Sequence, residues 1–167
     1  EERYADHIYY SLDEALKLNI DLAIIATPAV FHIDQAIEFM KSDINVLIEK
    51  PISHNTDDIH KLLKVNKQSN AIGTVGYCLR YSPAAIEFKK KLQSNKIGKI
   101  LNVSIDCGSY LPNWRPNRDY KDSVSAKENL GGGVMLELSH DLDYIRWFFG
   151  DMKSVSSSLV NSGILSL

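Results

Sequence analysis

"DLAIIATP", residues 21–28, is the stretch that decides the fold. Its apolar side chains follow one another without alternation until a Thr-Pro pair ends the run. Such an unbroken run is typical of a strand that is covered on both faces, as the strands of parallel sheets are. Residues 45–51, NVLIEKP, and residues 71–80, AIGTVGYCLR, are further runs of the same kind. We therefore predict three strands of one parallel sheet.

Helical patterns separate these predicted strands. Residues 29–41 carry an apolar stripe at helical spacing, and Thr56 is predicted to cap a second helix with an acidic first turn. A short helix over residues 11–19 is expected before the first strand. Over residues 1–80, the alternation of helix and strand predicts βαβ units, whose ligands bind where the strands end.

The second half of the chain follows a different pattern. A Ser-Pro start predicts a helix over residues 82–95, and residues 100–111 alternate apolar and polar side chains, as an antiparallel strand with one wet face does. A polar loop then leads to a glycine-led helix over residues 131–150, and the last residues look like one or two more strands. We expect an α/β protein with a parallel sheet in residues 1–80 and a mainly antiparallel sheet in residues 81–167.

The composition excludes several classes of function. The 167 residues are 44% hydrophobic and 24% charged, with a net charge of −2 and a pI of about 6.2. No basic field could attract nucleic acid or an anionic membrane, and no apolar run is long enough to span a bilayer. Cys78 and Cys107 lie far apart, outside any metal-type spacing, and fit a reducing compartment. We predict a soluble, cytoplasmic protein without a metal site, a nucleic-acid partner or membrane contact.

Lys50 is the first candidate for chemistry, because it stands at the end of an apolar strand. Apolar surroundings disfavour the charged form of a lysine, which suits the side chain to proton transfer. Pro51 restricts Lys50 to extended geometry and allows a cis peptide bond. The alternative is a solvated lysine that pairs with its neighbour Glu49.

The second candidate is a group of polar residues in the glycine-led helix. At helical spacing, Glu137 lies on one face with His140 and Asp141. A carboxylate beside an imidazole can orient the ring and support its protonated form. The alternative is that His140 is a satisfied core or cap histidine. The E-x-x-H spacing also occurs in di-iron sites, but the chain has only one copy, so we expect no metal.

Further residues carry weaker indications of function. Arg80 follows the third predicted strand and suits forked contact with a carboxylate or phosphate, although a helix-flanking ion pair explains it equally well. His32 opens a helix and fits a structural role. The glycines at 131–133 allow close backbone approach or a sharp helix entry, with an anion-binding helix start as the alternative. The long polar loop, where substrate-binding side chains are common, carries Trp114, Arg115 and Tyr120.

Taken together, these residues resemble the Gfo/Idh/MocA family of nicotinamide-dependent oxidoreductases. The matching stretches, in chain order, are ATPAVFH at 26–32, VLIEKP at 46–51, GYCLRYSPA at 76–84 and GGGVMLELSHDLDYIRWFFG at 131–150. The resemblance covers nearly the whole chain. It implies the C-terminal part of a Rossmann domain, with a doubly wound parallel sheet, at residues 1–80. It implies the start of an α/β substrate and oligomerisation domain, with a mainly antiparallel sheet, at residues 81–167.

The resemblance also implies a reaction. A hydride would pass between the nicotinamide ring of NAD or NADP and a carbon of a sugar or polyol, and the hydroxyl proton would pass to a base. Lys50 is similar in position to the family's catalytic or substrate-orienting lysine, and the helix after the glycines usually offers an acid and a histidine to the substrate, here Glu137, His140 and Asp141. A homo-oligomer formed through the C-terminal sheet is expected. Residues similar to positions that border the cofactor are Thr27, Pro28, His32, Glu49, Lys50 and Arg80.

Departures from the family pattern lead to further expectations. The phosphate-cradling motif G-x-G-x-x-G is missing and the second sheet stops early, so we expect a piece of a longer enzyme, truncated at both ends and inactive alone. Asp141 stands where the family usually has its histidine, so either His140 or Asp141 could take the proton-transfer role. Cys78 stands where relatives often carry Asn. The alternative function is a non-catalytic relative that senses a sugar or dinucleotide or binds a partner.

Overall fold

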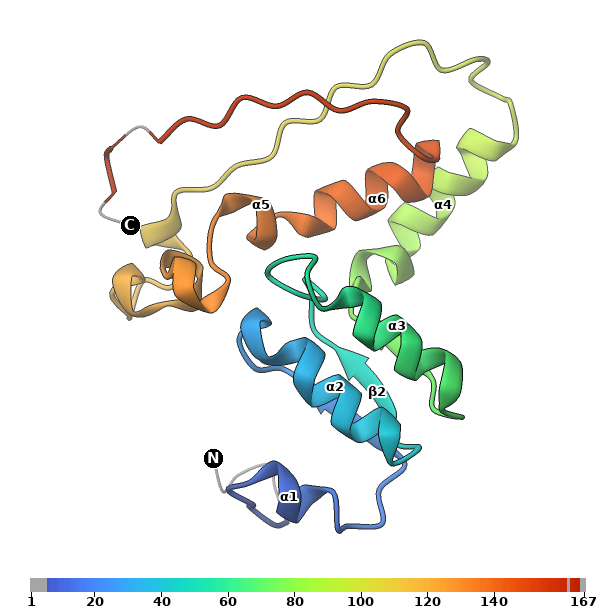
Figure 1. The fold of residues 1–167 in the computed structure, drawn as a ribbon. Coiled ribbons are helices and arrows are strands. Elements are labelled where there is room, and N and C mark those ends of the chain that lie inside the picture. Colours follow the sequence, from blue (N-terminus) through green and yellow to red (C-terminus); the bar gives the residue numbers. More distant parts are fainter. Residues whose placement is uncertain (1–5, 162, 166–167) are drawn as a thin grey trace. The chain divides into compact units, whose positions relative to one another are not determined.

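The computed structural model describes residues 6–161 and 163–165. It divides into two compact units, of which the first ends at Gly76 and the second begins at Tyr77. Figure 1 labels the main helices and colours the chain from blue, in the first unit, to red, at the end of the second. None of the described helices is both long enough and apolar enough to cross a membrane.

A parallel sheet forms the centre of the first unit. Its strands lie in the order β1 (Leu22–Ile25), β2 (Asn45–Ile48) and β3 (Gly73–Val75), and both neighbouring pairs are parallel. The register aligns the last residues of β1 and β2, so these strands end at a common carboxyl edge. The predicted parallel sheet is confirmed, although its third strand is shorter than the run that predicted it.

Two helices pack against this sheet and against each other (Figure 1). A 3-10 turn, η1 (Ala29–Phe31), leads from β1 into α2 (His32–Lys41), and α3 (Ile59–Gln68) connects β2 to β3. Apolar side chains of both helices join those of the strands in one buried cluster. Its most deeply buried members include Val46, Ile48 and Met40.

The two faces of the sheet differ in burial. Successive side chains of a strand point to opposite faces, and in β1 the buried Ala23 and Ile25 alternate with Leu22 and Ile24. Ile24 is 66% exposed. The expectation that both faces of this strand are covered is therefore not met in the structure, where the packed helices cover one of them.

Helix boundaries in the first unit differ from the predicted ones at the end of α1 (Leu12–Ala15), which stops at Ala15 and not at residue 19, and at the start of α3. Ser11 caps α1 as predicted, because its hydroxyl accepts the Glu14 N–H at 3.2 Å. Thr56 is not the cap of α3, since that helix begins at Ile59 with Asp58 at the cap position. The Thr56 carbonyl instead accepts the Ile59 N–H at 3.4 Å, which leaves the preceding residues as a turn.

The regular secondary structure in the described part of the second unit consists of helices and 3-10 turns. The longer helices begin and end close to the predicted positions, but the glycine-led helix is divided into two. Its elements are η2 (Cys78–Tyr81), α4 (Pro83–Gln93), η3 (Leu111–Asn113), η4 (Tyr120–Asp122), η5 (Val124–Ala126), η6 (Glu128–Leu130), α5 (Val134–Glu137) and α6 (Ser139–Phe149).

The antiparallel strands predicted for this half are not formed by the described residues. Figure 1 shows the segments that follow α4 and α6 as extended chain, and no strand is assigned between Tyr77 and the end of the described chain. An extended segment needs neighbouring strands to pair its backbone groups and become a stable sheet. Residues 162, 166 and 167, which belong to the last predicted strands, lie outside the described residues.

Candidate functional site

The turn after β2 lies at the carboxyl edge of the sheet and contains Lys50. The Glu49 N–H donates to the Ile25 carbonyl of β1 at 2.9 Å, and the Gly76 N–H donates to the Ile48 carbonyl at 2.7 Å. The Lys50 N–H donates to the Glu49 carboxylate at 3.1 Å, and the Lys50–Pro51 peptide bond is cis. Lys50 is half-buried. Its predicted place at a strand's carboxyl end is therefore confirmed.

The turn after β1 lies at the same edge. The Thr27 hydroxyl donates to the Gln35 side-chain oxygen at 2.8 Å, which ties the turn to α2. Pro28 follows with an extended backbone and precedes η1. Thr27 is exposed and Pro28 is half-buried, so both residues remain accessible at the edge where ligands of parallel sheets bind.

His32, at the start of α2, is enclosed by the two turns. Only 1% of its surface is exposed. Its Nδ1 lies 2.8 Å from the Pro51 carbonyl oxygen, and its Nε2 lies 2.8 Å from the Thr27 carbonyl oxygen. Both ring nitrogens thus face backbone oxygens, and neither is directed to a ligand. This geometry supports the structural alternative for His32, and its predicted place beside the cofactor stays a prediction.

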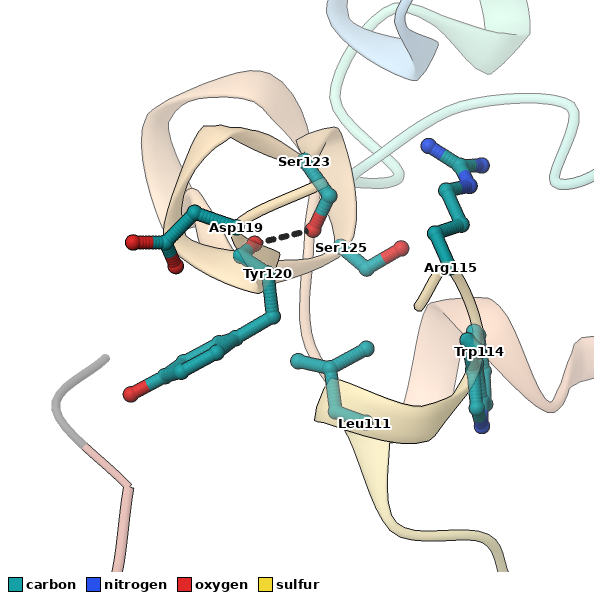
Figure 2. A pocket seen from close by; sticks show the side chains of 7 residues that line it. All are labelled: Leu111, Trp114, Arg115, Asp119, Tyr120, Ser123 and Ser125. Atoms are coloured by element: carbon teal, nitrogen blue, oxygen red, sulfur yellow. Dashed lines mark hydrogen bonds between the residues drawn. The ribbon is translucent and has the colours of Figure 1, made fainter. Parts of the chain in front are cut away.

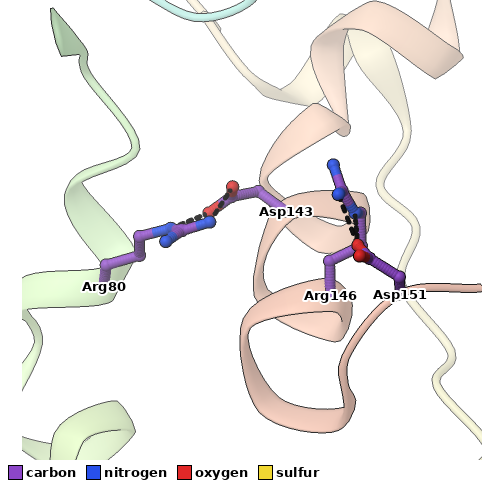
Figure 3. A network of polar contacts seen from close by, with 4 residues as sticks. All are labelled: Arg80, Asp143, Arg146 and Asp151. Carbon is purple, nitrogen blue, oxygen red and sulfur yellow. Dashed lines mark hydrogen bonds and ion pairs between the residues drawn. The ribbon is translucent and has the colours of Figure 1, made fainter.

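Arg80, in the second unit, makes a forked ion pair. Its Nε and Nη2 donate to the two carboxylate oxygens of Asp143 on α6, each at 2.7 Å (Figure 3). The hydrogen bond to Asp143 raises the pKa of Arg80 above its usual value. Arg80 also lies over the Trp147 ring, 5.9 Å from its centroid. The geometry supports the ion-pair alternative for Arg80, with a partner that is distant in the sequence.

The Glu137, His140 and Asp141 group does not lie on one continuous helix. Leu138 interrupts the predicted helix, so Glu137 ends α5 while His140 and Asp141 stand in the first turn of α6. His140 is half-buried, and its ring meets the Tyr77 ring edge-on at 5.7 Å between centroids. The spacing argument assumed one continuous helix, and the structure divides that helix at Leu138.

Asp141 has two polar neighbours that the sequence did not indicate. The Tyr144 hydroxyl donates to its carboxylate at 2.7 Å. This hydrogen bond, with burial as a second cause, raises the pKa of Tyr144 to about 12. A hydrogen bond to the same carboxylate is the first cause of the raised pKa of the Cys107 thiol. In the described part of the chain, no three His, Cys, Asp or Glu side chains gather as ligands of a metal ion would.

The predicted substrate loop encloses a very small cavity. Trp114, Arg115 and Tyr120 line it together, as Figure 2 shows, but its volume is only about 10 Å³. A cavity of this volume holds about one water molecule. In Figure 2, Leu111 is seen between Arg115 and the Tyr120 ring. The loop residues therefore lie together without forming a sugar-sized pocket by themselves.

A larger hollow of about 260 Å³ lies beside this loop within the second unit. Its volume is close to the lower end of the range for small-molecule sites. Trp114 and Glu137 were sequence candidates, and the hollow brings them together. Several of its residues were missed, because they belong to the extended segment that was expected to be a strand or to the loop. The missed lining residues include Cys107, Ser109, Tyr110 and Ser125.

The triple glycine joins this loop to the start of α5. A Cβ on Gly132 would lie 2.3 Å from the Val124 carbonyl oxygen and 2.7 Å from that of Ser125. The Gly132 N–H donates to the Lys127 carbonyl at 2.9 Å, and the Gly133 N–H donates to that of Ser125 at 3.1 Å. The predicted close backbone approach is confirmed, and it fixes one wall of the larger hollow.

Two family sequence models match the chain. Residues 1–77 match the oxidoreductase family with an NAD-binding Rossmann fold, GFO_IDH_MocA. Residues 86–163 match the GFO/IDH/MocA C-terminal domain. Between them the two matches include every candidate site residue except Arg80.

Individual relatives are similar at low identity. The chain is 25% identical over 143 residues to levoglucosan dehydrogenase of Pseudarthrobacter phenanthrenivorans, covering 84% of the chain and 36% of the relative. It is 25% identical over 157 residues to scyllo-inositol 2-dehydrogenase (NAD(+)) of Bacillus subtilis, covering 93% and 42%. The solved structure of scyllo-inositol dehydrogenase from Lactobacillus casei with bound NAD(H) and scyllo-inositol is 26% identical, with a TM-score of 0.68, covering 84% and 41%. The chain thus spans less than half of each relative's length.

Proposed function

We propose a function from one premise: this chain belongs to the Gfo/Idh/MocA family of oxidoreductases. The proposed reaction of the full-length protein is the oxidation of a sugar or polyol alcohol to a carbonyl. The C–H bond breaks as a hydride leaves the carbon, the O–H bond breaks as its proton passes to a base, and the C=O bond forms. Bound NAD or NADP supplies the hydride acceptor.

The position of Lys50 carries this proposal. It stands at the carboxyl edge of a parallel sheet, in the unit that matches an NAD-binding Rossmann model. Ligands of such sheets bind at this edge, and a half-buried lysine there can accept or relay a hydroxyl proton. The exposed Thr27 and Glu49 stand at the same edge and fit the nicotinamide end of the cofactor. The position of Lys50, its partial burial, the family match of its unit and its two exposed neighbours support Lys50 as the proton-transfer residue.

The hollow in the second unit supports a ring-shaped polyol as the substrate class. Trp114 and Tyr110 offer aromatic surface, while Glu137 and Ser109 offer oxygen atoms that can accept hydrogen bonds from hydroxyl groups. The relatives that act on levoglucosan and scyllo-inositol, as their names state, belong to this substrate class. We propose that Glu137 binds substrate hydroxyls and that Asp141, held by Tyr144, supports the same region.

The test is turnover by the full-length protein with a matched pair of variants. Levoglucosan, scyllo-inositol and myo-inositol are offered with NAD⁺ and with NADP⁺, and reduced nicotinamide is followed by its absorbance. We expect turnover of at least one polyol, and Lys50→Met is expected to lower kcat by roughly 10²- to 10⁴-fold.

Lys41→Met is the control for this substitution. Lys41 lies at the C-terminal end of α2, is exposed and pairs with Glu38 at 2.8 Å. The control should retain wild-type kcat, since α2 runs back from the carboxyl edge and ends away from it. Undiminished turnover by Lys50→Met, or no turnover of any polyol by the wild-type protein, contradicts the proposal.

A further inference from the structure

We propose that His32 is a positioning residue that fixes Lys50 by holding the two turns of the carboxyl edge in place. The inference rests on the proposed function, because it assigns His32 a role through Lys50. His32 itself is buried and touches the turns only through the carbonyl oxygens of Thr27 and Pro51, each 2.8 Å from a ring nitrogen.

Both contacts of the ring are with groups that can only accept a hydrogen bond. A neutral imidazole has one donor nitrogen and one acceptor nitrogen, so it could satisfy only one of the two carbonyl oxygens. Both contacts are hydrogen bonds only when each ring nitrogen carries a proton. With 1% of the residue exposed, water cannot replace either partner from solvent. The two carbonyl oxygens are therefore the polar contacts that hold the ring between the two turns.

The bond to Pro51 completes the attachment of the Lys50 turn. Glu49, the residue before Lys50, is held because its N–H donates to the Ile25 carbonyl of β1 at 2.9 Å. Pro51, the residue after Lys50, has no N–H, so its carbonyl is the backbone group through which it can be held. His32 supplies that bond. Lys50 is thereby attached on one side to the sheet and on the other to α2.

The contact with Thr27 attaches the neighbouring turn, which follows β1, to the same helix. The Thr27 carbonyl oxygen faces His32, and the Thr27 hydroxyl donates to Gln35, which stands one helical turn further along α2. The first turn of α2 therefore sets the separation of the β1 turn and the Lys50 turn. The separation matters, because misplacement of a catalytic group by about 1 Å can lower a rate by roughly 10²-fold.

An apolar side chain could fill the same space without making these bonds. His32 belongs to a helix whose other buried side chains are apolar, among them Ile33, Ala36 and Met40. Volume-conserving replacements in a core usually cost less than about 1.5 kcal/mol. His32→Leu thus separates the loss of the two hydrogen bonds from a loss of packing. His32→Gln retains an amide N–H that can donate to one of the two carbonyls.

The kinetic test uses the full-length protein and the polyol assay. We expect His32→Leu to lower kcat at least roughly tenfold, with a much smaller change in the KM for NAD⁺, and His32→Gln to recover part of that loss. Met40→Ala, on the same helix and 1% exposed, controls for destabilisation and should keep wild-type kcat. Equal losses in Met40→Ala and His32→Leu, or wild-type kcat in His32→Leu, overturn the inference.

The same assay separates this inference from the proposed function. If Lys50→Met loses turnover while His32→Leu keeps it, the proposed function stands and the inference is overturned. The second measurement is nitrogen-15 NMR of the wild-type ring, which does not depend on turnover. A His32 ring N–H signal that exchanges slowly with solvent, together with shifted Thr27 and Lys50 amide signals in His32→Leu, is the expected result. A rapidly exchanging ring N–H, or unshifted amides, overturns the inference.

Discussion

The two units of the molecule are stabilised by different kinds of contact. Every buried hydrophobic residue in the described chain lies between Ala23 and Ala71, inside the first unit. The described buried residues of the second unit include serines, and its aromatic side chains, such as Phe88 and Phe148 at 5.0 Å, remain partly accessible. Apolar packing thus stabilises the first unit, while hydrogen bonds, ion pairs and backbone contacts stabilise the second. Substitutions should therefore act by loss of packing in the first unit and by loss of specific contacts in the second.

The largest effect is expected from opening a cavity in the first unit. Ile48 is 2% exposed in β2, and Ile48→Ala should lower the free energy of unfolding by about 2–5 kcal/mol. Ile24→Ala, on the open face of the same sheet, should change it by less than about 0.5 kcal/mol. Urea unfolding of the chain, followed by circular dichroism, measures both. Equal losses in the two variants would remove the distinction between the two faces.

A methyl group in the second unit should act by steric conflict instead. Gly132→Ala places a Cβ 2.3 Å from the Val124 carbonyl oxygen and should destabilise the loop and α5 by about 1–3 kcal/mol. Gly108→Ala is the control, because a Cβ there meets no atom within 4 Å. Hydrogen exchange at residues 124–137 measures the local effect. Unchanged protection in Gly132→Ala would show that the glycine contact does not hold this region.

The forked ion pair should show a smaller, measurable coupling. A double-mutant cycle with Arg80→Ala and Asp143→Ala is expected to give about 1 kcal/mol, since Asp143 is mostly buried but Arg80 is partly screened by solvent. Arg146 and Asp151, which also pair but are far more exposed, are the comparison (Figure 3). Their cycle should give a weaker coupling that added salt removes. A stronger coupling in the exposed pair would contradict the role given to Arg80.

The smallest effect is a pH dependence that involves Tyr144. Its pKa is raised to about 12, because its hydroxyl donates to Asp141, and an unfolded tyrosine ionises near pH 10. The folded state therefore keeps this proton where the unfolded state has lost it, so the contribution to stability is present below about pH 10 and is lost as pH rises to about 12. The ultraviolet difference between wild type and Tyr144→Phe should show ionisation of this tyrosine above that of the others. Ionisation at the ordinary tyrosine pKa would contradict the Asp141 contact.

The contrast between the units also explains what the sequence could predict. Short apolar runs predicted β1 and β2, and the alternation of helix and strand around NVLIEKP predicted that Lys50 lies at a carboxyl edge. The same runs could not tell whether Ile24 is covered, because coverage depends on elements outside the strand. The stretch at 100–111 has a strand pattern but no described strand partner, so local pattern alone was insufficient.

Contacts between distant residues account for most of the differences at the candidate site. Arg80 pairs with Asp143, 63 residues further on, and His32 reaches Pro51, 19 residues further on. No local pattern reports such partners. The break at Leu138 was equally hidden, because leucine favours helices and only its backbone angles, φ −92° and ψ 22°, reveal the interruption.

Transfer of deuterium tests the central claim most directly. The full-length protein is given NAD⁺ or NADP⁺ and a cyclic polyol that carries deuterium on its ring carbons, and the reduced cofactor is analysed by mass spectrometry. The proposal predicts that the reduced cofactor carries the deuterium, and that Lys50→Met forms almost none of it. Reduced cofactor without deuterium, or equal formation by Lys50→Met, would contradict hydride transfer assisted by Lys50.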